Sequence, residues 1–369
     1  PTSTPDDTEK IFTEEIKLNI LAFNANGNFS SGVTKEDLVI LEDGRIHQAT
    51  SVRRIPANVL ILLDVGNENS FGKNKKMTSS AAIGLINSLQ AEDSVAIMQY
   101  AEKVEFVSEW TTDKKSLVPL LDERKLGQGL RSAFNQALDT ALKFFQKSSL
   151  ENRHLVLITD GIDSYNDQKL RESALKNLLS SDINVHVISF TTMAQTSINV
   201  NNSVVKGGEA NPQRLPEEVL ITLPQQQQQV LRLPRLGSIN VDRKLIKKRK
   251  EQAENLKKSE EFLTKIAEET NGEIFLPQTK DELLEKMPQV AKIIDSSYVV
   301  TYIPNRPLSE VTKDEERNIE VTSKRNGLQI QAKRKLFQFF IFGTTVVKLT
   351  NAGEELVGRK GQIVTSINF

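Results

Sequence analysis

The feature that most constrains this fold is a set of four short runs that are almost entirely apolar. They cover residues 59–63, 95–98, 155–158 and 185–188. Successive side chains of a strand point to opposite faces, so an unbroken apolar run indicates a strand that is buried on both faces. Such strands are typical of a parallel sheet covered by helices on both sides.

The segments between these runs have the period of helices. Helices are predicted at 77–89, 131–145, 170–179 and 280–294, and helical periodicity also covers 239–267. Residues 104–110 alternate in polarity and follow the second run closely, so they are expected to form an antiparallel edge strand. The order of elements predicts an α/β fold with a doubly wound, mostly parallel, Rossmann-like sheet.

The segments before and after this unit have the pattern of β-strands. Strands alternate with turn signals such as Asn26-Gly27 and Asp43-Gly44 before residue 56, and further strands are expected at 298–303, 319–322, 328–333, 345–349 and 362–367. The flanks are predicted to form one β-sandwich in which the α/β unit is inserted, because the ends of such a unit lie close together. Two separate flanking modules are the alternative. The predicted division is 1–56, 57–296 and 297–369.

A polar insertion is expected at about 191–240. It carries four prolines, Gly207-Gly208 and the glutamine run 225–229, a composition typical of a mobile segment. A short hairpin or docking segment within 219–231 is the alternative. The basic residues at 243–258 belong to an amphipathic pattern, so a solvated helix face is favoured over a surface for anions.

Composition excludes several classes of function. Basic and acidic residues number 48 each, so no net charge directs the chain to nucleic acid, and no apolar run is long enough to span a membrane. There is no cysteine, which leaves the redox compartment open. The polar start at Pro1 resembles a chain from which a signal segment has been removed, although a shortened chain would look the same.

Polar residues gather where the apolar runs end. Asp64 and Asp160 follow the first and third of these runs, and carboxyl ends of parallel strands converge on one crevice. Ser132 is expected to open a helix beside them, and Glu68 lies on the loop after Asp64. Carboxylates and hydroxyls in this arrangement suit a hard divalent cation that keeps several waters.

Three segments resemble the signature segments of von Willebrand factor A domains, namely 59–64, 132–138 and 156–161. The flanks at 33–44 and 298–304 resemble those of bacterial proteins with a related domain, most of which are exported. The resemblance implies a protein-binding or adhesion module in an extracytoplasmic location, with a cytoplasmic location left open.

The family's metal-ion-dependent adhesion site has an Asp-x-Ser-x-Ser loop, a Thr and a later Asp. Asp64 and Asp160 match this pattern, and Ser132 stands where Thr is expected, but Gly66 and Glu68 replace the two serines. Three carboxylates around a dication would repel an acidic residue of a partner. The predicted ligands of Mg²⁺ or Ca²⁺ are Asp64, Glu68, Ser132 and Asp160. A degenerate site on an intact scaffold is the alternative.

The sequence therefore predicts a non-enzymatic interaction module that binds a protein ligand. A metal-free structural or assembly scaffold of the bacterial cell envelope is the second hypothesis. A metal-assisted hydrolase is a third, with Glu68 or Asp163 as the base. His47, His154 and His186 are scattered and are expected to be structural, and no phosphate-binding loop or nucleophile elbow occurs.

Overall fold

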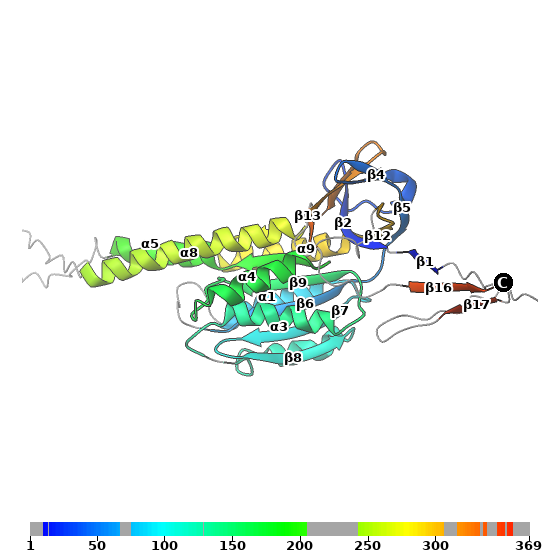
Figure 1. The fold of residues 1–369 in the computed structure, drawn as a ribbon. Helices are drawn as coiled ribbons and strands as arrows, with labels where there is room; N and C mark the ends of the chain where they lie inside the picture. Colours follow the sequence, from blue (N-terminus) through cyan, green and yellow to red (C-terminus); the bar gives the residue numbers. More distant parts are fainter. Residues whose placement is uncertain are drawn as a thin grey trace, which may run out of the picture.

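The computed structural model describes residues 10–13, 15–66, 75–127, 129–204, 243–305, 316–332, 335–337, 345–350 and 353–356. A helix-covered α/β unit lies beside a β-sandwich, and two helices extend from the α/β unit on the side away from the sandwich (Figure 1). The mixed α/β fold with a flanking sandwich, predicted from the sequence, is confirmed.

The central sheet has six strands in the order β11-β10-β9-β6-β7-β8. Its strands are β6 (Asn58–Asp64), β7 (Ser94–Tyr100), β8 (Val104–Thr111), β9 (Arg153–Thr159), β10 (Asn184–Ser189) and β11 (Ile274–Phe275). All neighbours are parallel except β7 and β8, which pair antiparallel. The predicted antiparallel edge strand is therefore confirmed.

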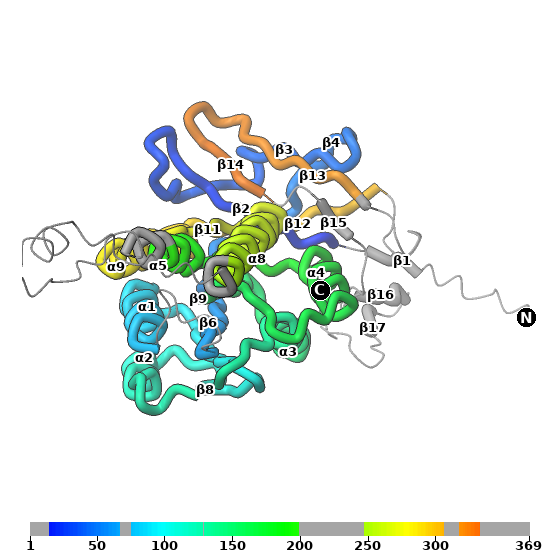
Figure 2. The backbone as a smooth tube through the Cα atoms, turned by 90° about the vertical axis from the view of Figure 1, so that its left-hand side faces the viewer, coloured from blue at the N-terminus to red at the C-terminus, as the bar shows by residue number. Residues whose placement is uncertain are grey.

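Each face of this sheet carries its own core. On β6, Val59 and Ile61 belong to one apolar cluster and Leu60 and Leu62 to the other, as expected for a strand buried on both faces. Helices α1 (Lys75–Ser88) and α9 (Lys280–Asp295) cover the first face, and α3 (Phe134–Gln146) and α4 (Gln168–Leu179) cover the second (Figure 2). A short helical stretch, α2 (Lys114–Leu117) and η2 (Val118–Leu121), follows β8.

The insertion begins and ends as helix. Helix α5 (Thr191–Val204) leaves the end of β10, and α8 (Arg243–Glu269) returns beside it (Figure 1). The first part of the insertion that was expected to be mobile, residues 191–204, is instead a helix, because Ala194 and Ile198 are buried against Leu256 of α8 and this packing stabilises it. The hairpin or docking segment considered at 219–231 lies outside the described residues.

The sandwich draws strands from both flanks. One sheet has the order β14-β2-β12-β5 and the other β15-β13-β3-β4. The strands are β2 (Ile16–Asn24), β3 (Leu38–Glu42), β4 (Arg45–His47), β5 (Ala49–Arg53), β12 (Ser297–Tyr302), β13 (Glu316–Ser323), β14 (Leu328–Ala332) and β15 (Lys335–Phe337), with the 3-10 turn η1 (Lys35–Asp37) before β3. Apolar residues of both sheets, such as Ile20, Ile40 and Val300, form one core between them.

The C-terminal strands after β15 lie elsewhere. Strand β16 (Thr345–Thr350) pairs with β1 (Lys10–Thr13) and with β17 (Gly353–Leu356) in a separate three-stranded sheet. The strand expected at 362–367 lies outside the described residues.

The α/β unit joins the sandwich through two neighbouring strands. β5, which leads into the unit, pairs antiparallel with β12, which leaves it, in the register Val300 to Val52. The predicted boundaries at 56/57 and 296/297 remain a proposal, which the starts of β6 and β12 support. Every helix among the described residues is too short or too polar to cross a lipid bilayer.

Candidate functional site at the carboxyl edge of the sheet

The reversal of strand order falls beside β6, which has β7 on one side and β9 on the other. Asp64, the last residue of β6, pairs with Tyr100, the last residue of β7. Leu63 pairs with Ile158 of β9, so Thr159 and Asp160 end β9 at the same level. The candidate site therefore lies at the switch point, where open α/β sheets bind ligands.

Asp64 is the centre of a buried polar network. Its side chain is fully buried. Atom Oδ1 accepts hydrogen bonds from the Gly66 N–H and the Ser132 hydroxyl, both at 3.1 Å. Atom Oδ2 accepts one from the Thr159 hydroxyl at 2.9 Å. Both carboxylate oxygens thus have donors from the chain itself, which compensates the burial of the charge.

Thr159 links Asp64 to Tyr100. Because its hydroxyl hydrogen goes to Asp64, Thr159 Oγ1 acts as acceptor for the Tyr100 hydroxyl at 2.7 Å and for the Gly161 N–H at 2.8 Å. Burial, and next the Asp64 carboxylate, raises the pKa of Tyr100 well above its usual value. The phenol therefore keeps its proton and remains a donor at neutral pH.

Ser132 connects the site to the loop after β9. Its N–H donates to Ser164 Oγ at 2.9 Å, and the Ser164 N–H donates to the Ser132 carbonyl at 2.8 Å. Ser132 was expected to open a helix, but α3 begins at Phe134, and Ser132 is a buried residue of the preceding loop. The Ala133 N–H donates to the Ala101 carbonyl at 2.7 Å, which holds this segment beside the residue that follows β7.

Asp160 lies at the same edge and is 3% exposed. Its Oδ1 accepts the Ile162 N–H at 3.0 Å, and its carbonyl accepts the Ser259 hydroxyl of α8 at 2.5 Å. Both Asp64 and Asp160 contribute to the raised pKa of Tyr100, so both carboxylates lie within electrostatic reach of the phenol. The structure thus brings Asp64, Ser132 and Asp160 to one edge.

Gly66 occupies a position with no room for a side chain. A Cβ atom there would lie 2.1 Å from Ser132 Oγ and 2.6 Å from the Arg131 carbonyl oxygen. The close approach comes with a parallel bridge between Gly66 and Gly129. The serine found here in the family's motif does not fit beside Ser132 as this chain places it. Glu68, the remaining predicted ligand, lies outside the described residues.

The donor set decides which cation could fit. Within the described residues, no group of three or more Asp, Glu, His or Cys side chains is arranged to hold a metal ion. Asp64, Asp160 and Ser132 supply two carboxylates and one hydroxyl, and Asp64 already accepts three hydrogen bonds. Among the described residues, this set fits a cation that keeps most of its waters, as Mg²⁺ does.

Asp163, one of the two residues considered as the base of a hydrolase, accepts hydrogen bonds from the backbone. Asp163 Oδ1 accepts the Asn135 N–H at 3.0 Å, and its Oδ2 accepts the N–H groups of Tyr165 and Asn166 at 3.2 and 2.7 Å. Its carboxylate therefore organises the loop after β9. His154 and His186 stack in the sheet with ring centroids 5.4 Å apart. Both are fully buried, at the second residue of β9 and the third residue of β10, away from the carboxyl edge.

The chain is similar to several solved structures. No curated protein matches the chain. Similar solved structures include the conserved hypothetical protein BatB from Bacteroides thetaiotaomicron, with 21% identity, a TM-score of 0.31, and coverage of 36% of this chain and 66% of that one. An aerotolerance-related membrane protein from Bacteroides fragilis NCTC 9343, with multiple mutations to serines, has 17% identity, a TM-score of 0.37, and coverage of 64% and 98%.

A von Willebrand factor type A structure from Catenulispora acidiphila has 10% identity, a TM-score of 0.41, and coverage of 89% of this chain and 74% of that one. Residues 59–162 match the family described as von Willebrand factor type A domain. These residues span β6 to β9 and include Asp64, Ser132 and Asp160. The chain therefore contains a von Willebrand factor type A domain.

Proposed function

We propose that this chain is a non-enzymatic protein-interaction module that docks a protein ligand on the carboxyl edge of its parallel sheet. One observation carries the proposal. The two loops that Ser132 and Ser164 tie together present Leu130 and Tyr165 to solvent, with exposed fractions of 75% and 49%. Domains of this type typically bind other proteins, which agrees with such a surface.

The exposed surface of these two loops, here called the rim, carries residue types that are common at the centre of protein interfaces. The Arg131 guanidinium lies 5.8 Å from the centroid of the Tyr165 ring, within cation–π distance. Tyrosine and arginine are enriched among the residues that contribute most to binding. Because the Asp64 network is buried beneath them, these loops lose little conformational freedom when a partner docks.

A divalent cation at this edge remains part of the proposal. Asp64, Ser132 and Asp160, with Glu68 from the loop after β6, are the proposed ligands of Mg²⁺ or Ca²⁺. A bound cation would supply positive charge for an acidic group of the partner. Ser132 and Asp64 hold each other in place through their 3.1 Å hydrogen bond.

A metal-free scaffold role in the cell envelope is the second candidate. It is supported by the Asp64 carboxylate, whose charge the chain's own donors already compensate. The extracytoplasmic location is likewise a proposal, which rests on the resemblance of the flanks at 33–44 and 298–304. A hydrolase is not favoured, because both oxygens of Asp163 accept backbone N–H groups.

The test is capture of partners from the native cell envelope by the full chain, with and without a chelator. Leu130→Asp and Tyr165→Asp place a charge on the proposed surface and should each remove the same set of captured proteins. Ile46→Asp is the matched control, because Ile46 is a 72% exposed apolar residue on β4 of the sandwich. Equal capture by all three variants would contradict the proposal. Capture that survives chelation assigns the docking to a metal-free surface.

A further inference from the structure

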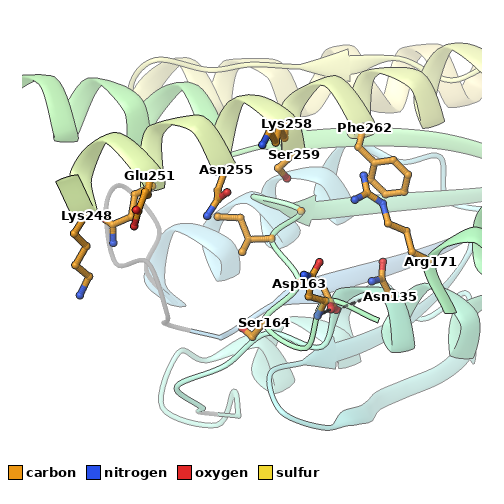
Figure 3. A pocket seen from close by; sticks show the side chains of 14 residues that line it. Asn135, Asp163, Ser164, Arg171, Lys248, Glu251, Asn255, Lys258, Ser259 and Phe262 are labelled. Atoms are coloured by element: carbon orange, nitrogen blue, oxygen red, sulfur yellow. Dashed lines mark hydrogen bonds between the residues drawn. The ribbon is translucent and has the colours of Figure 1, made fainter. Parts of the chain in front are cut away.

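A groove of about 570 Å³ opens next to the candidate site, between the loop after β9 and the N-terminal half of α8 (Figure 3). Residues of that loop, including Asp163 and Ser164, form its floor, and one face of α8 forms the opposite wall. Arg171 of α4 and Asn135 of α3 line it as well. Its volume falls in the range of known ligand sites.

Arg171 is held in position but has no ion-pair partner among the described residues. Its guanidinium carbon lies 3.8 Å from the centroid of the Phe262 ring of α8. Stacking on an aromatic face leaves the N–H groups at the edge of a guanidinium open for hydrogen bonds. Both Arg171 and Phe262 line the groove (Figure 3).

Asn135 adds a second polar group to the end of the groove where Arg171 lies. The residue is only 3% exposed, and its backbone N–H donates to Asp163. Its side-chain amide makes no hydrogen bond with any described residue, although it lines the groove and points toward Arg171 (Figure 3). The amide therefore offers a donor and an acceptor to a polar group in the groove.

The charged residues that line the groove are three basic ones, Arg171, Lys248 and Lys258, and two acidic ones, Asp163 and Glu251. Asp163 accepts three backbone N–H groups. Glu251 lies 3.9 Å from Lys247 on the same helix. Lys248, at the other end of the groove from Arg171, has no ion-pair partner within the described part of the chain. The groove therefore offers unpaired donors at both ends.

We propose that this groove binds a carboxylate-bearing peptide segment of the partner, with a carboxylate on the Arg171 guanidinium and the Asn135 amide. The proposal rests on the proposed function, because the floor of the groove is the loop that carries Tyr165. It assigns the recognition of an acidic residue to an arginine fork, which binds carboxylates bidentately. A peptide suits the site better than a small anion because the groove extends along α8 from Arg171 to Lys248.

The test measures fluorescence anisotropy of a short dye-labelled peptide in which glutamate alternates with glycine, added to the full chain. Arg171→Gln should weaken binding about tenfold or more, because it removes charge-assisted hydrogen bonds. Arg171→Lys should recover only part of the loss, since lysine lacks the fork. Lys248→Gln changes an exposed side chain, so it tests the groove without risk to the fold and should weaken binding by about threefold.

Two controls separate the groove from general electrostatics. Arg45→Gln removes the same charge from an exposed residue of β4 in the sandwich and should leave binding unchanged. The same peptide with glutamine in place of glutamate should not bind. Circular dichroism and the thermal midpoint of each variant show that it is folded.

Four outcomes overturn the proposal: no binding of the glutamate peptide, equal binding of the glutamine peptide, equal loss from Arg45→Gln and Arg171→Gln, or displacement by inorganic phosphate with an affinity like that of the peptide. The last outcome assigns the groove to a free anion. If Leu130→Asp removes captured partners and Arg171→Gln does not, the docking surface stands and the peptide groove fails. If Arg171→Gln removes captured partners and Leu130→Asp does not, the peptide groove is supported and the docking surface at Leu130 fails.

Discussion

Ser132 and Ser164 hold each other through two hydrogen bonds of opposite direction, from the Ser132 N–H to the Ser164 hydroxyl and from the Ser164 N–H to the Ser132 carbonyl. The loop before α3 and the loop after β9 are thus one unit, although 32 residues separate the two serines. Leu130 and Tyr165 are carried by these two loops. A change that disturbs either loop is therefore expected to alter both.

Thr159→Val is expected to lower the free energy of unfolding by about 1–3 kcal/mol, the cost of leaving buried polar groups without a partner. The substitution removes the donor to Asp64 Oδ2 and the acceptor of the Tyr100 hydroxyl while preserving volume. Urea unfolding measures the change. Thr140→Val, which removes a hydroxyl bonded to its own helix, is the control and should cost much less. Equal losses in the two variants would contradict the role of the network.

Gly66→Ala is expected to destabilise the domain by about 1–3 kcal/mol, as overpacking does. The added methyl group would meet Ser132 Oγ and the Arg131 carbonyl, and the carbonyl belongs to a backbone that Ser164 holds in place. Gly84→Ala of α1 is the control, because the atoms nearest its Cβ belong to the Met287 side chain, at 3.2 and 3.5 Å, and not to the backbone. The higher helix propensity of alanine should offset part of this contact, so the loss should be smaller than in Gly66→Ala. A neutral Gly66→Ala, measured by the same urea titration, would show that the loop relaxes at no cost.

Stability should fall as the pH drops from about 6.5 toward 4, because of the buried histidine pair. Desolvation lowers the pKa of His154 well below its usual value, and it lowers the pKa of His186 to about 4. In this window the unfolded chain binds protons that the folded chain does not. Each histidine should therefore remove about 2 kcal/mol of stability between pH 7 and pH 5.

The histidine contribution can be isolated with H186Q, which removes one of the two titrating groups. The decrease in the free energy of unfolding between pH 7 and pH 5, measured in urea, should be smaller in H186Q by about 2 kcal/mol. If the wild-type protein and H186Q lose stability equally over this range, the pair does not control the pH dependence.

Titration with Mg²⁺, Mn²⁺ or Ca²⁺ tests the proposed cation at Asp64, Ser132 and Asp160. A cation that binds only the folded chain should raise its stability by about 2.7 kcal/mol at a concentration one hundred times the Kd. Asp160→Ala should abolish the dependence of the thermal midpoint on the cation. Asp113→Ala, which removes an exposed carboxylate after β8, should retain it. No shift in the wild-type protein would exclude these residues as a cation site.

The architecture could be predicted because it depends on local patterns. A run such as 59–63 is apolar at every position, and the structure divides it between the cores on the two faces of the sheet. Helix α5 could not be predicted, since its stability comes from the burial of Ala194 and Ile198 against Leu256, far away in the sequence. The pairing of β16 with β1 likewise joins the two ends of the chain and leaves no local pattern.

The sequence predicts which residues lie at the candidate site, but it does not predict the hydrogen bonds between them. Asp64 and Asp160 converge because both follow parallel strands, which the strand pattern shows. That Asp64 would accept hydrogen bonds from Thr159, Ser132 and the Gly66 N–H depends on distances of a few ångströms that no spacing in the sequence specifies. Arg171 and Phe262 meet across the groove only because α8 returns to the sheet after the insertion.

The pairing of β5 with β12 has a mechanical consequence. The chain enters the α/β unit through one of these strands and leaves through the other, and Arg54 forms an ion pair with Asp295 at their junction. A tensile load on the two flanks is therefore carried by the ladders that join them, and the ladder between β5 and β12 is the last of these before the α/β unit. The docking edge should keep its shape under tension until that ladder opens.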